Sequence, residues 1–116
     1  MHELSIAISI VDLVLDQATR ASADRVSEVE LDIGTHSGIE YKSLEFALGI
    51  ASRETMLEET LFRINRVEPV AECPACRHLY TPEGVFSYCP ECNEQGIRLI
   101  QGTELQIKSL LVEQNE

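Results

Sequence analysis

Two Cys-x-x-Cys pairs constrain this chain more than any other feature of its sequence. The pairs are Cys73–Cys76 and Cys89–Cys92; twelve residues separate them, and they contain every cysteine present. Zn²⁺ binds four thiolates tetrahedrally, and a short hairpin between two such pairs brings four sulfurs around one ion. Pro74 and Pro90 fix φ directly after each leading cysteine, which favours a tight turn. The spacing therefore predicts a closed, structural zinc site that folds the residues around it.

Disulfide bonds and a redox Cys-x-x-Cys are the alternative uses of such pairs. Met1 is followed by a His and a Glu, and no basic segment precedes the first apolar stretch, so we expect no signal peptide. A chain that is not exported stays in a reducing compartment, where disulfides are rare. A redox site needs one pair rather than two matched ones. We therefore expect a cytoplasmic protein that binds one Zn²⁺ through Cys73, Cys76, Cys89 and Cys92.

The charge balance narrows the range of partners. Twenty acidic residues against nine basic ones give a formal net charge of −11. Zinc ribbons that bind nucleic acid place Lys and Arg against phosphate, and the few basic residues here form no cluster. No apolar run is long enough to span a bilayer. We expect neither nucleic acid nor membrane as a partner, which leaves proteins and cations.

The first long periodic segment predicts an amphipathic helix over residues 4–22. Its polar stripe consists of Ser5, Ser9, Asp12, Asp16 and Thr19. The opposite side, which we expect to be buried, consists of Leu4, Ile8, Val11, Leu15 and Ala18, widened by Ile6, Ile10, Leu13 and Val14.

The next two segments predict a strand and a second helix. Residues 25–33 alternate between apolar and acidic side chains, which indicates a half-buried strand that ends at Gly34. Val26 breaks the alternation, so we expect a bulge near the start. Ser37–Glu40 matches a capping box and predicts a helix running to about Arg53. Its expected buried face is Leu44, Ala47, Leu48 and Ala51.

The remaining strands complete an α+β fold. Phe62 and Ile64 mark a second strand that Pro69 ends or places at an edge, and a last strand runs from Leu105 to Val112. We expect two helices on a small mixed three-stranded sheet, with a zinc ribbon inserted before the last strand. Residues 1–69 and 101–116 then form one domain and residues 70–100 the ribbon. We expect a monomer or weak dimer.

The amino terminus is a second candidate metal site because of His2. The α-amine of Met1, the backbone amide of His2 and the imidazole of His2 are three nitrogens in chelating positions, and the amide of Glu3 can supply a fourth. A square-planar nitrogen set favours Ni(II) or Cu(II) over zinc. On spacing alone, a solvated terminus is the simpler interpretation. We expect His36, in a polar turn, and His78, in the ribbon, to be surface residues or neighbours of the zinc ligands.

Several motifs together resemble the HypA/HybF family of hydrogenase-maturation nickel chaperones. The similarity covers essentially the whole chain, in the same order and at similar length. It is carried by the opening Met1–Ser5 with the helix after it, the strand Val29–Gly34, the four cysteines at the family's zinc positions, and the closing strand Gly102–Leu110.

This resemblance implies a function. Met1, His2 and Glu3 would hold Ni(II) through the α-amine, the imidazole and backbone amides, and the four cysteines would hold structural zinc. The chain would deliver nickel to the large subunit of [NiFe]-hydrogenase during maturation, together with a HypB-type GTPase, and would not be an enzyme.

Two other classes of protein remain as rival interpretations. A zinc-ribbon interaction module in transcription or translation would carry no transported metal and would not use His2. An enzyme would need an open metal position or a catalytic set. No Ser-His-Asp set or phosphate loop is visible, and four cysteines on one zinc leave no position for an activated water.

Overall fold

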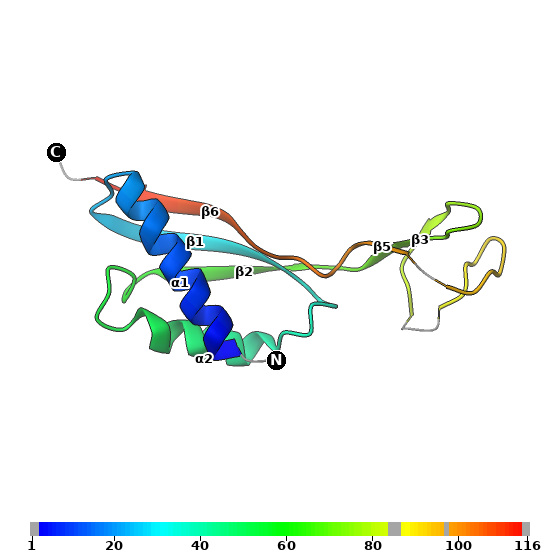
Figure 1. The fold of residues 1–116 in the computed structure, drawn as a ribbon, viewed down its shortest axis with the longest axis horizontal. Helices are drawn as coiled ribbons and strands as arrows, with labels where there is room; N and C mark the ends of the chain where they lie inside the picture. Colours follow the sequence, from blue (N-terminus) through cyan, green and yellow to red (C-terminus); the bar gives the residue numbers. More distant parts are fainter. Residues whose placement is uncertain (1–2, 84–86, 97, 115–116) are drawn as a thin grey trace.

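The computed structural model describes residues 3–83, 87–96 and 98–114, and it places two helices and two small sheets along an elongated molecule of 60 × 27 × 16 Å. The helices lie over one sheet, and the second sheet lies at the far end of the molecule (Figure 1). In chain order the elements are α1 (Glu3–Arg20), β1 (Arg25–Gly34), α2 (Tyr41–Ser52), β2 (Leu61–Val67), β3 (Val70–Glu72), β4 (Leu79–Tyr80), β5 (Arg98–Gln101) and β6 (Leu105–Glu113).

The larger sheet is mixed, with strand order β2-β1-β6. β1 runs parallel to β2, and α2 lies in the crossover that connects these two strands. β1 runs antiparallel to β6. The register shifts between Val26 and Glu28, so the bulge expected at Val26 is present. β3, β4 and β5 form the second sheet between β2 and β6 in the chain. The predicted α+β architecture with an inserted ribbon is confirmed.

The core lies between the helices and β1. Val29, Leu31 and Ile33 point toward the helices and are at most 1% exposed. The acidic residues between them, Glu30 and Asp32, point to the opposite face of the sheet, here called the open face, and are partly accessible. From α1 the core receives Ala7, Ile10, Val11, Val14 and Ala18. The predicted polar stripe of α1 is exposed throughout, as expected.

The predicted buried face of α1 was partly wrong. Leu4 and Ile8 are 48% and 47% exposed, Leu13 is 55% exposed, and Leu15 is only partly buried. α1 packs against α2 as well as over the sheet, and it turns its small residue Ala7 into the core. Small side chains allow closer helix packing than leucines do, so the helix rotates away from the face with the largest apolar residues.

α1 ends two residues earlier than predicted, and the start of α2 also differs from the prediction. The capping box was wrong: Glu40 is itself the N-cap of α2, and its carboxylate accepts a 2.6 Å hydrogen bond from the Ser43 amide. Ser37 instead accepts from the Ile39 amide within the preceding turn. The predicted face of α2 is correct for Leu44, Ala47 and Leu48, which are buried, whereas Ala51 is partly buried.

Two chain segments, β2 to β3 and β5 to β6, connect the two sheets at a narrow junction, and the turn after β1 packs against both of them. A Cβ on Gly34 would overlap the carbonyl of Gly102, and Gly102, at φ 118°, lies so close to Pro69 that its own Cβ would be 2.7 Å from the proline Cα. The His36 amide donates to the Gly102 carbonyl at 2.7 Å, and the Thr35 amide donates to Val67. These contacts hold the two connecting segments against the turn that follows β1.

Candidate metal centre

Each cysteine pair closes a backbone turn of the same design. The amide four residues after the leading cysteine donates to that cysteine's carbonyl at 2.8 Å, and the leading cysteine's own amide donates to the carbonyl five residues on. Arg77 and Asn93 close the two turns at φ 64° and 61°, a conformation that asparagine tolerates better than arginine. Because the turns match, the two pairs present their thiols in the same way from opposite sides.

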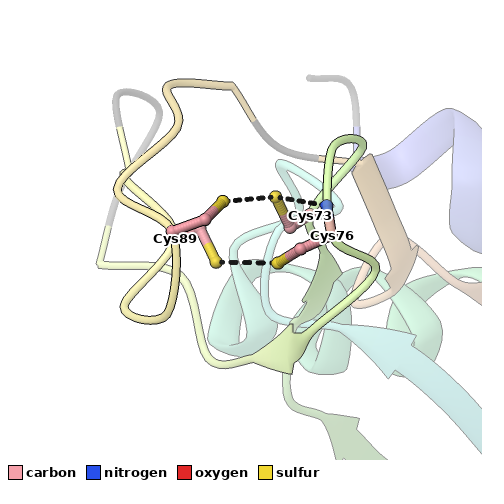
Figure 2. A group of neighbouring side chains, drawn as sticks. Cys73, Cys76 and Cys89 are labelled. Atoms are coloured by element: carbon pink, nitrogen blue, oxygen red, sulfur yellow. Dashed lines mark hydrogen bonds between the residues drawn. The ribbon is translucent and has the colours of Figure 1, made fainter.

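The four sulfurs converge on a single point. The Cys73 and Cys92 sulfurs are 3.5 Å apart, the Cys76 and Cys89 sulfurs are 3.6 Å apart, and all four lie within 4.8 Å of one another. Figure 2 shows thiols from the two turns pointing toward each other. Four sulfurs at about 2.3 Å from a tetrahedral Zn²⁺ are roughly 3.8 Å apart. The four cysteines therefore fit one zinc ion, and the predicted ligands are brought together.

The electrostatics of the cluster favour a divalent cation. The Cys76 amide donates to the Cys73 sulfur, and this hydrogen bond lowers the pKa of Cys73 to about 7. A Glu94 amide favours the thiolate of Cys92, but the neighbouring Cys73 thiol and burial outweigh it and raise the pKa of Cys92 to about 12. Several thiols this close cannot all ionise unless a cation compensates their charge, which a bound Zn²⁺ does.

The surroundings of the cluster are partly open. Cys73 and Cys89 are buried, whereas Cys76 and Cys92 are exposed. The His78 ring stacks on Tyr80 with ring centroids 6.3 Å apart, and its Nε2 lies 4.0 Å from a Glu91 carboxylate oxygen. Within the described ranges, the four cysteines form the only group of three or more potential ligand side chains, and it contains no histidine.

The second candidate site lies mostly outside the described residues. Met1 and His2 precede them, and Glu3 is the first residue of α1. The Glu3 carboxylate accepts a 3.3 Å hydrogen bond from the amide of Glu40, the N-cap of α2. This contact joins the start of α1 to the start of α2, and the sequence carries no periodic signal for it because the partners are 37 residues apart. His36 is exposed, with Nδ1 3.4 Å from the Thr35 hydroxyl.

Comparison with known proteins identifies the family. A family model described as "Hydrogenase/urease nickel incorporation, metallochaperone, hypA" matches residues 1–112. The chain belongs to the HypA family. The hydrogenase maturation factor HypA of Parabacteroides distasonis is 40% identical over 112 residues, covering 97% of each chain. That of Chlorobium limicola is 40% identical over 116 residues, covering both chains completely. The HypA/HybF resemblance stated from the sequence is confirmed.

Two solved HypA structures share the fold. The solution structure of the nickel metallochaperone HypA from Helicobacter pylori is 23% identical, covers 99% of this chain and 100% of its own, and superposes with a TM-score of 0.72. A second solution structure of a HypA protein is 24% identical, covers 97% and 96% of the two chains, and gives a TM-score of 0.75.

Membership of the HypA family settles the broad activity. The chain is a nickel-incorporation metallochaperone of hydrogenase maturation, and such proteins are not enzymes. The two rival interpretations, an enzyme and an interaction module without a transported metal, are therefore wrong. Neither helix in the described part of the chain is long and apolar enough to cross a membrane.

Proposed function

We propose that this HypA-family chain binds Ni(II) at its amino terminus and delivers it to the large subunit of [NiFe]-hydrogenase, while the four cysteines hold a structural Zn²⁺. The observation that supports this division is the sulfur cluster. Its four sulfurs lie within 4.8 Å of one another, so a zinc ion bound to all four would have no open position for a travelling ion. The nitrogens of Met1, His2 and Glu3 form a set of the kind that Ni(II) prefers.

The zinc has a structural role in this proposal because the described residues of the ribbon bury few apolar side chains. Apart from the cysteines, Ala71 and Pro82 are the buried apolar residues among the described positions of 70–101. We infer that residues 70–100 form a domain held by zinc, and that residues 1–69 with 101–116 form the nickel-binding α+β domain. Occupation by zinc also keeps the thiolates away from nickel.

The partners follow from the delivery step. A HypB-type GTPase and the hydrogenase large subunit are the proteins that we propose the chain contacts, as a monomer or weak dimer. We place this exchange in the cytoplasm, where thiols stay reduced and available to zinc.

Replacement of His2 tests the nickel assignment. His2→Ala and a matched control, His36→Ala, are titrated calorimetrically with nickel after full loading with zinc and with no residues ahead of Met1. We expect His2→Ala to weaken nickel binding at least about 100-fold, because the imidazole closes the chelate, and His36→Ala to leave binding unchanged. Unchanged affinity in His2→Ala would defeat the assignment.

An amino-terminal extension tests the α-amine separately. Adding two glycines ahead of Met1 converts the amine into an amide, so nickel affinity should fall while zinc content stays the same. An extended protein that binds nickel as tightly as the native chain would show that the amine is not a ligand.

A further inference from the structure

The last strand of the chain lies at an open edge of the sheet. β6 is terminal in the order β2-β1-β6, and within the described residues it pairs only with β1. Over the nine residues Leu105–Glu113 its outer backbone amides and carbonyls therefore have no strand partner. Such an edge is a template for another strand unless the fold covers it.

An apolar groove runs beside this edge on the helix side of the sheet. It has a volume of 490 Å³ and lies between one face of α1 and the first half of β6. Its apolar walls are Ile6, Ile10 and Leu13 from α1 and Leu105 and Ile107 from β6, with Ser5, Ser9 and Gln106 at the margins. Leu13 and Leu105 are 55% and 45% exposed, so the groove is open to a partner.

The charges around the groove and the edge are mostly negative. Asp12 and Asp16 lie on the exposed side of α1, and Glu104 and Glu113 lie at the two ends of β6. On the open face of the sheet, β1 carries Glu28, Glu30 and Asp32, and two cations, Arg63 and Lys108, pair with the first two of these. A strand added at β6 would enter this negative field, which favours a basic segment.

We propose that β6 and the groove dock an extended, basic segment of another protein, which adds to the sheet as a fourth strand. Successive side chains of a strand point to opposite faces, so every second residue of the segment enters the groove beside Leu13, Leu105 and Ile107. The residues between them point to the open face and lie next to β6, so lysine or arginine there is attracted by the negative field of β1 and Glu113 rather than by direct contact with the β1 carboxylates. A second copy of the chain fits less well, because each copy carries a net charge of −11 and the same acidic edge. This docking surface does not depend on the nickel assignment.

A synthetic strand tests the proposal with the full zinc-loaded chain. The probe is the nonapeptide Lys-Val-Thr-Val-Lys-Val-Thr-Val-Lys with a fluorescent label, and its control has the three lysines replaced by glutamate. We expect the basic peptide to bind at about 10–100 µM, because a short strand is ordered only on binding. The acidic peptide should bind at least about tenfold more weakly at low salt. Amide exchange of β6 should slow when the basic peptide is present.

Paired charge substitutions locate the contact. Leu13→Glu and Leu105→Glu put a carboxylate into the groove, and each should weaken binding about tenfold or more because apolar contact is lost. Ile8→Glu on α1 and Leu61→Glu on β2, at the opposite edge of the sheet, are the matched controls, since these residues are 47% and 57% exposed but do not line the groove. The control variants should bind the peptide as the native chain does.

Three results would overturn the proposal. One is the absence of peptide binding and of slower amide exchange in β6. Another is equal weakening by groove and control variants. The third is sedimentation showing a dimer of the native chain that only Leu13→Glu and Leu105→Glu disrupt, because the occupant would then be a second copy.

Discussion

Removal of the metal should unfold the ribbon and leave the α+β core folded. Among the described ribbon residues, Ala71, Pro82 and the two buried cysteines are the apolar groups that leave water. At about 0.8 kcal/mol per buried CH₂-sized group, each contributes on the order of 1–2 kcal/mol. A structural zinc contributes about 10–16 kcal/mol of apparent binding free energy at neutral pH. Together these four groups contribute about 4–8 kcal/mol, so the metal is the larger stabilising term by about twofold.

The α+β core has no such dependence. Val29, Leu31 and Ile33 of β1 are sealed beneath α1 and α2, and none of these elements contains a cysteine. The segments that connect the two sheets are held by the turn after β1, because Val67 and Gly102 accept hydrogen bonds from the Thr35 and His36 amides. Loss of order in the ribbon can therefore stop at this junction.

Amide hydrogen exchange before and after chelation is the appropriate assay. We expect amides of β3, β4 and β5 to lose protection when a chelator removes zinc, while amides of β1 and α2 keep theirs. Re-addition of zinc should restore protection of the ribbon. Persistent protection of β3 and β5 in metal-free protein would refute the reasoning, and so would loss of protection in β1, because the core would then depend on the metal.

Two further predictions concern the core and the α2 cap. Leu31→Ala should lower the free energy of unfolding by about 2–5 kcal/mol in denaturant titrations, whereas Leu111→Ala, which changes an exposed side chain, should lower it by less than about 0.5 kcal/mol. The Ser43 hydrogen bonds hold the pKa of Glu40 below its usual 4.5, so the cap stabilises the fold above that pH and the effect is lost as the pH falls through the lowered pKa. Glu40→Gln should therefore melt at a lower temperature than the native chain at pH 7, and the difference should narrow as the pH falls through the lowered pKa of Glu40. Equal melting temperatures at pH 7 would contradict the capping role.

Local patterns predicted the elements and the cluster of four cysteines because their signals lie within a few residues. The alternation from Val29 to Ile33 identifies β1, and the two Cys-x-x-Cys turns identify the metal centre, since each pair forms its own geometry before the pairs meet. The start of α2 was wrong because Ser37 and Glu40 both carry capping side chains, and sequence spacing does not decide which of them is the N-cap. The contact between Glu3 and Glu40 depends on tertiary placement and has no local signal.

The wrong buried face of α1 has a consequence for the surface of the molecule. Helical spacing counts apolar residues on a wide arc but does not say which part of the arc the sheet and α2 will cover. Ala7 and Ala18 are buried, whereas the larger Leu13 is left exposed and lines the groove together with Leu105. Apolar side chains that exceed what the core needs cost solubility unless a partner covers them. The exposed apolar side chains of α1 and the unpaired edge of β6 therefore lie next to the same groove. A docked strand would bury these side chains and pair with the backbone of β6.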